Sequence, residues 1–100
     1  MSAGFVVALH HAEGRLLLAV CDAELAGARF EEGGAQLDLG SPFFSGREVS
    51  GPELLELFGR VNIINIVGPR AVALAIGAGV VNARSVGRIA GVPHAQALRL

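Results

Sequence analysis

The run LLLAV, residues 16–20, decides how the chain folds, because it carries no polar residue on either face. An uninterrupted apolar run is typical of a strand that is covered on both faces, whereas a half-exposed strand alternates. A second β-rich run, residues 4–10, precedes it across HAEG, in which Gly14 can take the positive φ of a short hairpin. We therefore expect residues 15–21 to form a central strand, paired antiparallel with the strand before it.

Two helices are expected to pack on this sheet. Ser50 and Glu53 have the spacing of a capping box, and apolar residues then recur at helical spacing up to Val61. A second helix is predicted to begin at Pro69, whose missing N–H is tolerated in a first turn, and to end near Gly79. Its body, AVALAIGA, is apolar all round, so it must be enclosed by its own sheet or by a second copy.

Shorter elements complete the predicted fold. Asp22 is expected to cap a brief helical turn, AELAG, that ends at Gly27. The alternation in QLDL, residues 36–39, predicts a strand with one exposed face. A further short strand is predicted for SVGRIA, residues 85–90, and an extended segment for HAQALRL, residues 94–100. The sequence thus predicts an α+β fold of the two-layer α/β type, with a small mixed, largely antiparallel sheet packed by two main helices.

Length and composition limit the class of protein. One hundred residues suffice for one domain, which we expect to span residues 1–100. Hydrophobic residues make up 52% of the chain and charged ones 17%, which favours an apolar partner surface, such as a homodimer through the helix near Ala71 to Ala78. Cys21 is the only cysteine, so a reducing, cytoplasmic compartment is favoured. No run is long enough for a bilayer, and no membrane association is expected.

The charges are unevenly distributed. Residues 1–50 hold seven acids and three arginines, whereas residues 51–100 hold two acids and five arginines, although the net charge is only −1. This segregation indicates an anionic ligand or a complementary neighbouring subunit. Its expected carriers are Arg70, Arg84 and Arg88, and the alternative is an ordinary solvated face.

Two polar side chains near the C-terminus are candidates for ligand binding. His94 and Gln96 lie two residues apart on an extended segment, so they point to the same face, and Pro93 fixes the direction from which they enter. They can supply donors and acceptors to a ligand or a nucleotide. The alternative is that they bind the backbone of a neighbouring loop, because buried polar groups are normally satisfied within the protein.

A second group of candidates surrounds the start of the second helix. Asn62 and Asn65 precede it, and Gly68, Pro69 and Arg70 open it, so free N–H groups, a helix dipole and a guanidinium are expected to converge there. This pattern predicts a small-anion site. Asparagines before a helix also serve as caps or turns, which is the alternative interpretation.

The C-terminal motif carries a resemblance to a known family. RIAGVPHAQ, together with NIVGPRAVALAIGAGVV and LLAVCDAELAG, resembles family 424 of the domains of unknown function, found in archaea. The resemblance covers nearly the whole chain, and GVPHAQ is its most specific part. It implies an archaeal, cytoplasmic, two-layer α/β protein without an assigned activity, and an association with RNA or with the ribosome.

Other residues suggest weaker chemistry. Phe43 and Phe44 adjoin Arg47, so one ring can stack on a base while the other, on the opposite face of a strand, belongs to the core. Cys21 and His94 can in principle form a thiol–imidazole pair, although a cysteine ending an apolar strand is usually an inert hydrophobe. No metal or cofactor motif is present, and no hydrolytic triad is indicated.

Three functional hypotheses follow. The first is a non-catalytic binding module for RNA or a ribonucleoprotein in translation, using the basic C-terminal half and the polar residues Asn62, Asn65, His94 and Gln96. The second is a small enzyme or small-anion binder, with His94 beside Asn65 and the helix start at Gly68. The third is a homo-oligomeric structural protein. The first two require the C-terminal polar pair to lie on one surface with the asparagines.

Overall fold

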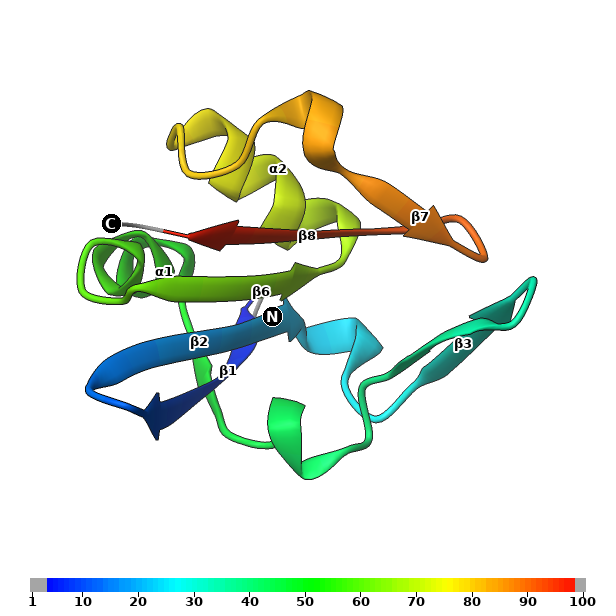
Figure 1. Ribbon diagram of the computed structural model, residues 1–100, viewed down its shortest axis with the longest axis horizontal. Helices are drawn as coiled ribbons and strands as arrows, with labels where there is room; N and C mark the ends of the chain where they lie inside the picture. Colours follow the sequence, from blue (N-terminus) through cyan, green and yellow to red (C-terminus); the bar gives the residue numbers. More distant parts are fainter. Residues whose placement is uncertain (1–3, 99–100) are drawn as a thin grey trace.

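The computed structural model describes residues 4–98 and contains a six-stranded sheet, a two-stranded arm and two helices (Figure 1). The strands of the large sheet are β1 (Phe5–Ala12), β2 (Arg15–Asp22), β5 (Arg47–Val49), β6 (Ile63–Val67), β7 (Gly87–Ile89) and β8 (Val92–Leu98). The arm consists of β3 (Arg29–Glu32) and β4 (Ala35–Asp38). The helices are α1 (Gly51–Phe58) and α2 (Pro69–Gly77), and the 3-10 turns are η1 (Ala23–Leu25), η2 (Pro42–Phe44) and η3 (Ala83–Ser85).

The strand order β5-β1-β2-β6-β8-β7 confirms β2 as an interior strand. Leu18, Ala19 and Val20 are fully buried, as expected of a strand that is covered on both faces. β1 and β2 form the predicted hairpin, and its turn residues Glu13 and Gly14 both have positive φ. β2 pairs in parallel with β6, whereas the other neighbours in the sheet are antiparallel. The predicted mixed, largely antiparallel sheet with two helices is confirmed.

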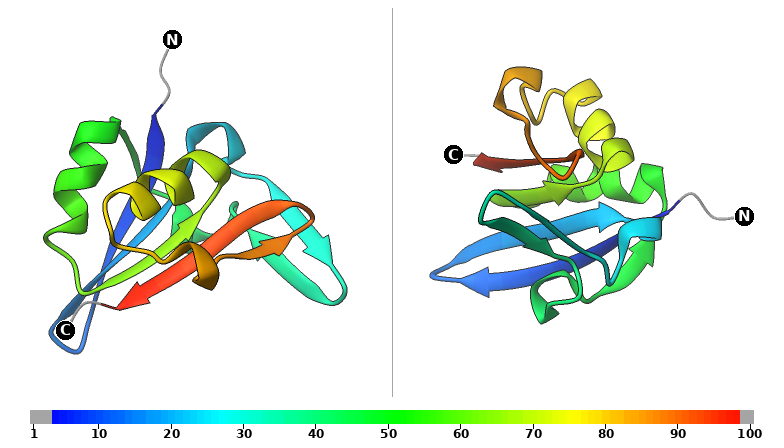
Figure 2. Two further views of the ribbon diagram at one scale, coloured as in Figure 1. Left: turned by 90° about the horizontal axis from the view of Figure 1, so that it is seen from above. Right: turned by 90° about the vertical axis from the view of Figure 1, so that its right-hand side faces the viewer.

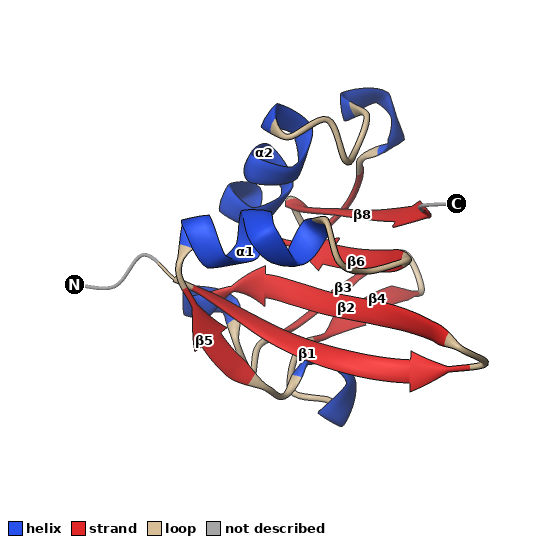
Figure 3. Cartoon of the chain, turned by 90° about the vertical axis from the view of Figure 1, so that its left-hand side faces the viewer, coloured by secondary structure: helices blue, strands red, loops and turns tan. Residues whose placement is uncertain are grey.

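Both helices lie on one face of the sheet, and the arm and η2 lie on the other (Figure 3). The predicted capping box starts α1, with Ser50 accepting from the Glu53 N–H and Glu53 accepting from the Ser50 N–H. Leu54 and Phe58 of α1 and Ala71 and Ala75 of α2 are buried against alternate residues of the strands. This packing forms the main core, and the opposite face carries a smaller cluster around Cys21, Leu39 and Val67.

Strand β6 was not expected from the sequence. The asparagines suggested a segment that leads into a helix, but Ile63–Val67 is instead a strand between β2 and β8. Ile64 and Ile66 face the main core, which places Asn65 on the opposite, helix-free face. The position of Asn65 on this face determines the site described below.

The alanine-rich side of helix α2 is mostly buried within the chain. Ala71 and Ala75 are fully buried against the chain's own sheet, which is one of the two coverings expected from the sequence, whereas Ala78 is exposed. The exposed residues of α2 are Pro69, Ala73, Ile76 and Gly77. Within residues 4–98, no helix is both long enough and apolar enough to cross a membrane.

Candidate ligand pocket

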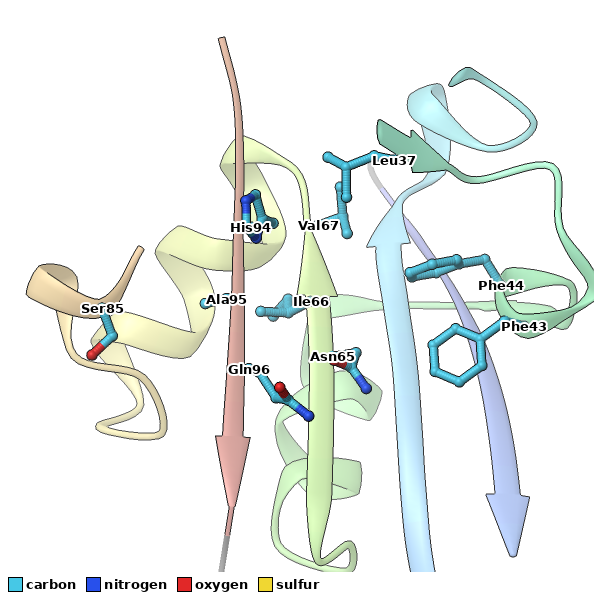
Figure 4. A pocket seen from close by; sticks show the side chains of 10 residues that line it. All are labelled: Leu37, Phe43, Phe44, Asn65, Ile66, Val67, Ser85, His94, Ala95 and Gln96. Atoms are coloured by element: carbon cyan, nitrogen blue, oxygen red, sulfur yellow. The ribbon is translucent and has the colours of Figure 1, made fainter. Parts of the chain in front are cut away.

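An open pocket of about 480 Å³ lies on the helix-free face, between strands β6 and β8 on one side and the turn η2 on the other (Figure 4). Its volume falls within the range of small-molecule sites. The floor comes from β6 and β8, and the walls come from β4, η2 and η3. The lining residues are Leu37, Phe43, Phe44, Asn65, Ile66, Val67, Ser85, His94, Ala95 and Gln96.

Three uncharged polar side chains converge on the pocket floor. Asn65 of β6 and Gln96 of β8 are direct cross-strand partners, and His94 lies one pair further along, opposite Val67. Asn65 and His94 are half-buried and Gln96 is exposed. Within residues 4–98, none of the three side chains has a hydrogen-bond partner, so their donors and acceptors are available to a ligand.

The sheet surface next to Asn65 and Gln96 carries small side chains. The row of register partners that contains Asn65 and Gln96 continues through Ala19 of β2 to Ala8 of β1. Both alanines are buried, and a methyl side chain raises the surface little above the backbone. The two amides are therefore accessible beside η2 rather than enclosed by large neighbours.

The aromatic wall is held in place by a histidine of β1. The His10 ring stacks on the Phe43 ring with centroids 4.8 Å apart and planes 5° apart, and its Nε2 lies 2.9 Å from the Phe43 carbonyl oxygen. Phe44 meets Phe43 edge to face and packs in the small cluster below the arm. The expectation of one core ring and one accessible ring is met, but in a 3-10 turn rather than a strand; Phe43 keeps 37% of its surface exposed.

The position of His94 depends on a glycine. His94 is the register partner of Gly87 on the edge strand β7. A methyl group at Gly87 would lie 2.9 Å from His94 Nε2 and 3.0 Å from its Cε1, closer than side-chain carbons approach such atoms. The imidazole therefore occupies the space that any other residue at position 87 would need.

The arm reaches the turn between β7 and β8, at the start of β8 (Figure 2). The Ala90 N–H, in the turn between β7 and β8, donates to Glu32 Oε1 at 2.6 Å. Leu37 of the arm lines the pocket at the end where His94 lies. This hydrogen bond thus joins the pocket's arm-side wall to its floor.

The start of α2 is not the free anion site that the sequence predicts. The buried carboxylate of Asp22 accepts the N–H of Arg70 at 3.0 Å and the N–H of Ala71 at 2.7 Å. Asp22 therefore caps α2 rather than η1, to which its side chain makes no capping bond. Gly68, with a φ of 113°, allows this approach, because a methyl group there would lie 2.5 Å from Asp22 Cγ. A carboxylate of the same chain occupies the expected anion position.

Arg70 is likewise engaged within the chain. Its guanidinium donates two hydrogen bonds to Glu24, at 2.8 and 2.5 Å, and a third to the Gly4 carbonyl oxygen, and it lies 4.7 Å from the Phe5 ring centroid. The hydrogen bond from Arg70 lowers the pKa of Glu24 to about 2. Arg70 thus holds the ends of β1, β2 and α2 together.

The remaining sequence-predicted residues are separated from one another. Asn62 lies just before β6. Its side-chain oxygen accepts a hydrogen bond from the Leu16 N–H at 2.8 Å, which links the start of β6 to the start of β2. Arg84 is exposed in η3, next to Ser85 of the pocket wall. Arg88 of β7 is the register partner of Pro93 of β8. It lines a groove next to α2, on the face of the sheet opposite His94. Of the four polar residues expected on one surface, Asn65, His94 and Gln96 share it and Asn62 does not.

Cys21 does not pair with His94. The register places Val67 of β6 between them, and burial with the neighbouring Asp22 raises the pKa of the Cys21 thiol to about 11. The thiol is therefore protonated at neutral pH and acts as part of the small cluster. Within the described residues, no group of three or more His, Cys, Asp or Glu side chains could hold a metal ion.

Several residues in and around the pocket are not predictable from the local sequence. Gly87 acts through the pairing of β7 with β8, and Ser85 lines the pocket from the preceding turn η3, so neither carries a local signal. Asp22 did give a capping signal, but the helix that it caps begins nearly fifty residues later. The sequence predicts base stacking for a phenylalanine of the pair Phe43 and Phe44, but it does not predict that Phe43 lies beside Asn65 and Gln96.

Comparison with known proteins gives a family and a fold. A family profile described as a protein of unknown function (DUF424) matches residues 10–100. A solved structure, the crystal structure of an uncharacterized conserved protein from Methanopyrus kandleri, is similar with a TM-score of 0.78 and 26% sequence identity, covering 98% of this chain and 95% of that one. No curated protein shows a significant match to the chain.

Proposed function

The chain belongs to the DUF424 family of proteins of unknown function, and from its pocket we propose a non-catalytic module that binds single-stranded RNA. The observation that carries this proposal is the convergence of three unpartnered polar side chains, Asn65, His94 and Gln96, beside the accessible ring of Phe43.

This combination suits an unpaired base. Proteins recognise single-stranded RNA by stacking bases on aromatic or imidazole rings and by hydrogen bonds to the base edges. Phe43, backed by His10, provides a ring of fixed orientation, and the amides of Asn65 and Gln96 provide donors and acceptors next to it. The His94 imidazole adds a further hydrogen-bonding group at the arm end of the pocket.

The phosphate backbone of the RNA needs a cation near the pocket. Arg84 adjoins Ser85 of the pocket wall and makes no ion pair within the described residues. We assign to it a contact with an RNA phosphate. Of the three arginines that the charge segregation suggested as contacts for an anionic ligand, Arg84 is the one that this proposal uses. A cytoplasmic setting and a place in a translation ribonucleoprotein are part of this proposal.

The test is direct binding of a labelled single-stranded RNA of mixed sequence, about twelve nucleotides long, followed by fluorescence anisotropy. Affinity is expected to fall with rising salt, because each phosphate contact releases counterions. Arg84→Glu should weaken binding and flatten the salt dependence, whereas Arg15→Glu, at an exposed arginine outside the pocket, should have a smaller effect. Absence of binding at low salt would end the proposal.

A second candidate function uses the same pocket for a small molecule. His94 is half-exposed on the pocket floor and unpartnered, so it can exchange a proton with a bound ligand. A small enzyme of this kind requires neither Arg84 nor a nucleic acid. Ligand-induced stabilisation by a small-molecule library, lost in His94→Ala and kept in Arg84→Glu, would favour it over RNA binding.

A further inference from the structure

Two unpartnered amides stand side by side on the pocket floor. Asn65 and Gln96 are register partners on antiparallel strands, where paired Cα atoms are about 4.5–5.5 Å apart. Figure 4 shows both side chains extending from their strands on the same side of the sheet. Each amide presents one N–H donor next to one carbonyl acceptor in a single plane. Each can therefore pair with a base edge on which a donor adjoins an acceptor.

Adenine is the base whose chemistry matches two such amides. Its amino group lies between two ring acceptors, N1 and N7, so each of its edges offers a donor beside an acceptor. The amino group of cytosine has a ring acceptor on one side only, that of guanine lies between a ring N–H and the acceptor N3, and uracil has a single N–H between two carbonyl groups. Adenine alone has an amino group with two hydrogens flanked on both sides by ring acceptors, so it can pair with two amides at once. We infer that Asn65 and Gln96 together select adenine among the four bases, an inference that rests on the proposed function.

The surroundings of the amides fit a neutral purine. None of the ten residues that line the pocket is an acid, a lysine or an arginine. Acidic side chains suit the amino groups of cytosine, and arginine or lysine suits the O6 and N7 acceptors of guanine, so an uncharged pocket disfavours both. The ring of Phe43 gives a stacking surface, and a purine overlaps it more than a pyrimidine does.

Selectivity is measured with oligouridine of about twelve nucleotides in which one central position is varied. A central adenine is expected to bind about tenfold more tightly than uracil, cytosine or guanine, because one bidentate contact discriminates by roughly five- to a hundredfold. Replacing that adenine with 7-deazaadenine or with 1-deazaadenine should each cost about fivefold, since each removes one ring acceptor.

Two variants and a matched control locate the selection in the protein. Gln96→Met and Asn65→Leu keep about the size of the side chain and remove the amide, so in both variants the central adenine should bind no more tightly than the other three bases. Gln36→Met, at an exposed glutamine of the arm outside the pocket, should leave the preference unchanged. Circular dichroism confirms that each variant is folded.

The outcomes separate the two proposals. Equal binding of all four central bases, or loss with only one of the two deaza bases, would overturn the adenine inference and leave RNA binding standing. Failure of every oligonucleotide to bind would overturn the proposed function itself. If adenosine monophosphate binds as tightly as the adenine-containing oligonucleotide, adenine selection is supported and the ligand is a free nucleotide instead of RNA.

Discussion

The start of α2 and the pocket floor adjoin the same strand, β6, yet their polar groups are used in opposite ways. At the start of α2, the Asp22 carboxylate accepts two backbone N–H groups and Arg70 is bound to Glu24. On the pocket floor, Asn65 and Gln96 have no partner within residues 4–98. Convergence of polar residues is common to both regions, so it does not by itself identify a ligand site. The pocket floor differs from the start of α2 in its unused hydrogen-bonding capacity, and the proposed function rests on that difference.

The largest expected effect is on stability, at the start of α2. Asp22→Ala removes a fully buried carboxylate and leaves two N–H groups without an acceptor, which should lower the free energy of unfolding by about 3 kcal/mol. Urea unfolding followed by circular dichroism measures this loss. Asp38→Ala, at an exposed aspartate bound to the Gly40 N–H, serves as the control and should cost under about 1 kcal/mol. Equal losses in the two variants would contradict the capping role.

A smaller loss of stability is expected from the glycine beside that carboxylate. Gly68→Ala places a methyl group against Asp22 at a φ of 113°, so both strain and displacement of the cap contribute about 2 kcal/mol or more. Gly79→Ala provides a matched control, because its φ is also positive, at 75°, but nothing lies within 4 Å of the added carbon. That variant should show the backbone strain alone, about 1 kcal/mol. A Gly68→Ala protein no less stable than Gly79→Ala would show that Asp22 yields without cost.

Gly87→Ala tests whether packing holds a pocket side chain in place, because the added methyl group would lie against the His94 imidazole. We expect a loss of stability of about 1 kcal/mol and a several-fold loss of RNA affinity, since the added methyl group displaces the His94 imidazole. In a His94→Ala background both effects of the glycine change should vanish, which a double-mutant cycle measures. Undiminished effects in that background would mean that Gly87 acts on something other than His94.

The smallest effect on stability is expected on the pocket floor itself. His94→Ala removes a side chain without a hydrogen-bond partner, so the free energy of unfolding should change by less than about 0.5 kcal/mol while RNA affinity falls several-fold. His11→Ala, at an exposed histidine of β1 outside the pocket, should change neither quantity. A large loss of stability in His94→Ala would assign this residue to the structure and remove the contrast between the regions.

The sequence predicted those elements whose signals are local. The hairpin of β1 and β2, the capping box of α1 and the start of α2 at Pro69 all depend on residues within a few positions of one another. Strand β6 was missed, although four of its five residues are β-branched, because the asparagines around it were interpreted as features of a helix start. Its β-branched composition was the available signal.

The candidate site was predictable only in part. The shared face of His94 and Gln96 follows from the alternation of a strand, and the structure places both in one pocket. Their association with Asn65 depends on the pairing of β6 with β8, and the occupation of the α2 start by Asp22 depends on the parallel pairing of β2 with β6. Pairings between strands far apart in the sequence are not visible in the local pattern of residues. The sequence therefore could not show that the polar groups at the start of α2 are bound within the chain while those of the pocket floor are not.

The two-stranded arm closes on itself at its base, where the Gly27 N–H donates to the Leu39 carbonyl and the Leu39 N–H to the Ala28 carbonyl. A change in the length of the arm therefore closes its loop between two fixed backbone hydrogen bonds at little entropic cost, and it acts on the rest of the chain through Leu37 and the bond from Ala90 to Glu32. The side of the pocket that Leu37 forms can in this way change while the floor from β6 and β8 stays intact. Specificity can thus diversify in evolution without renewed selection for the ability to fold.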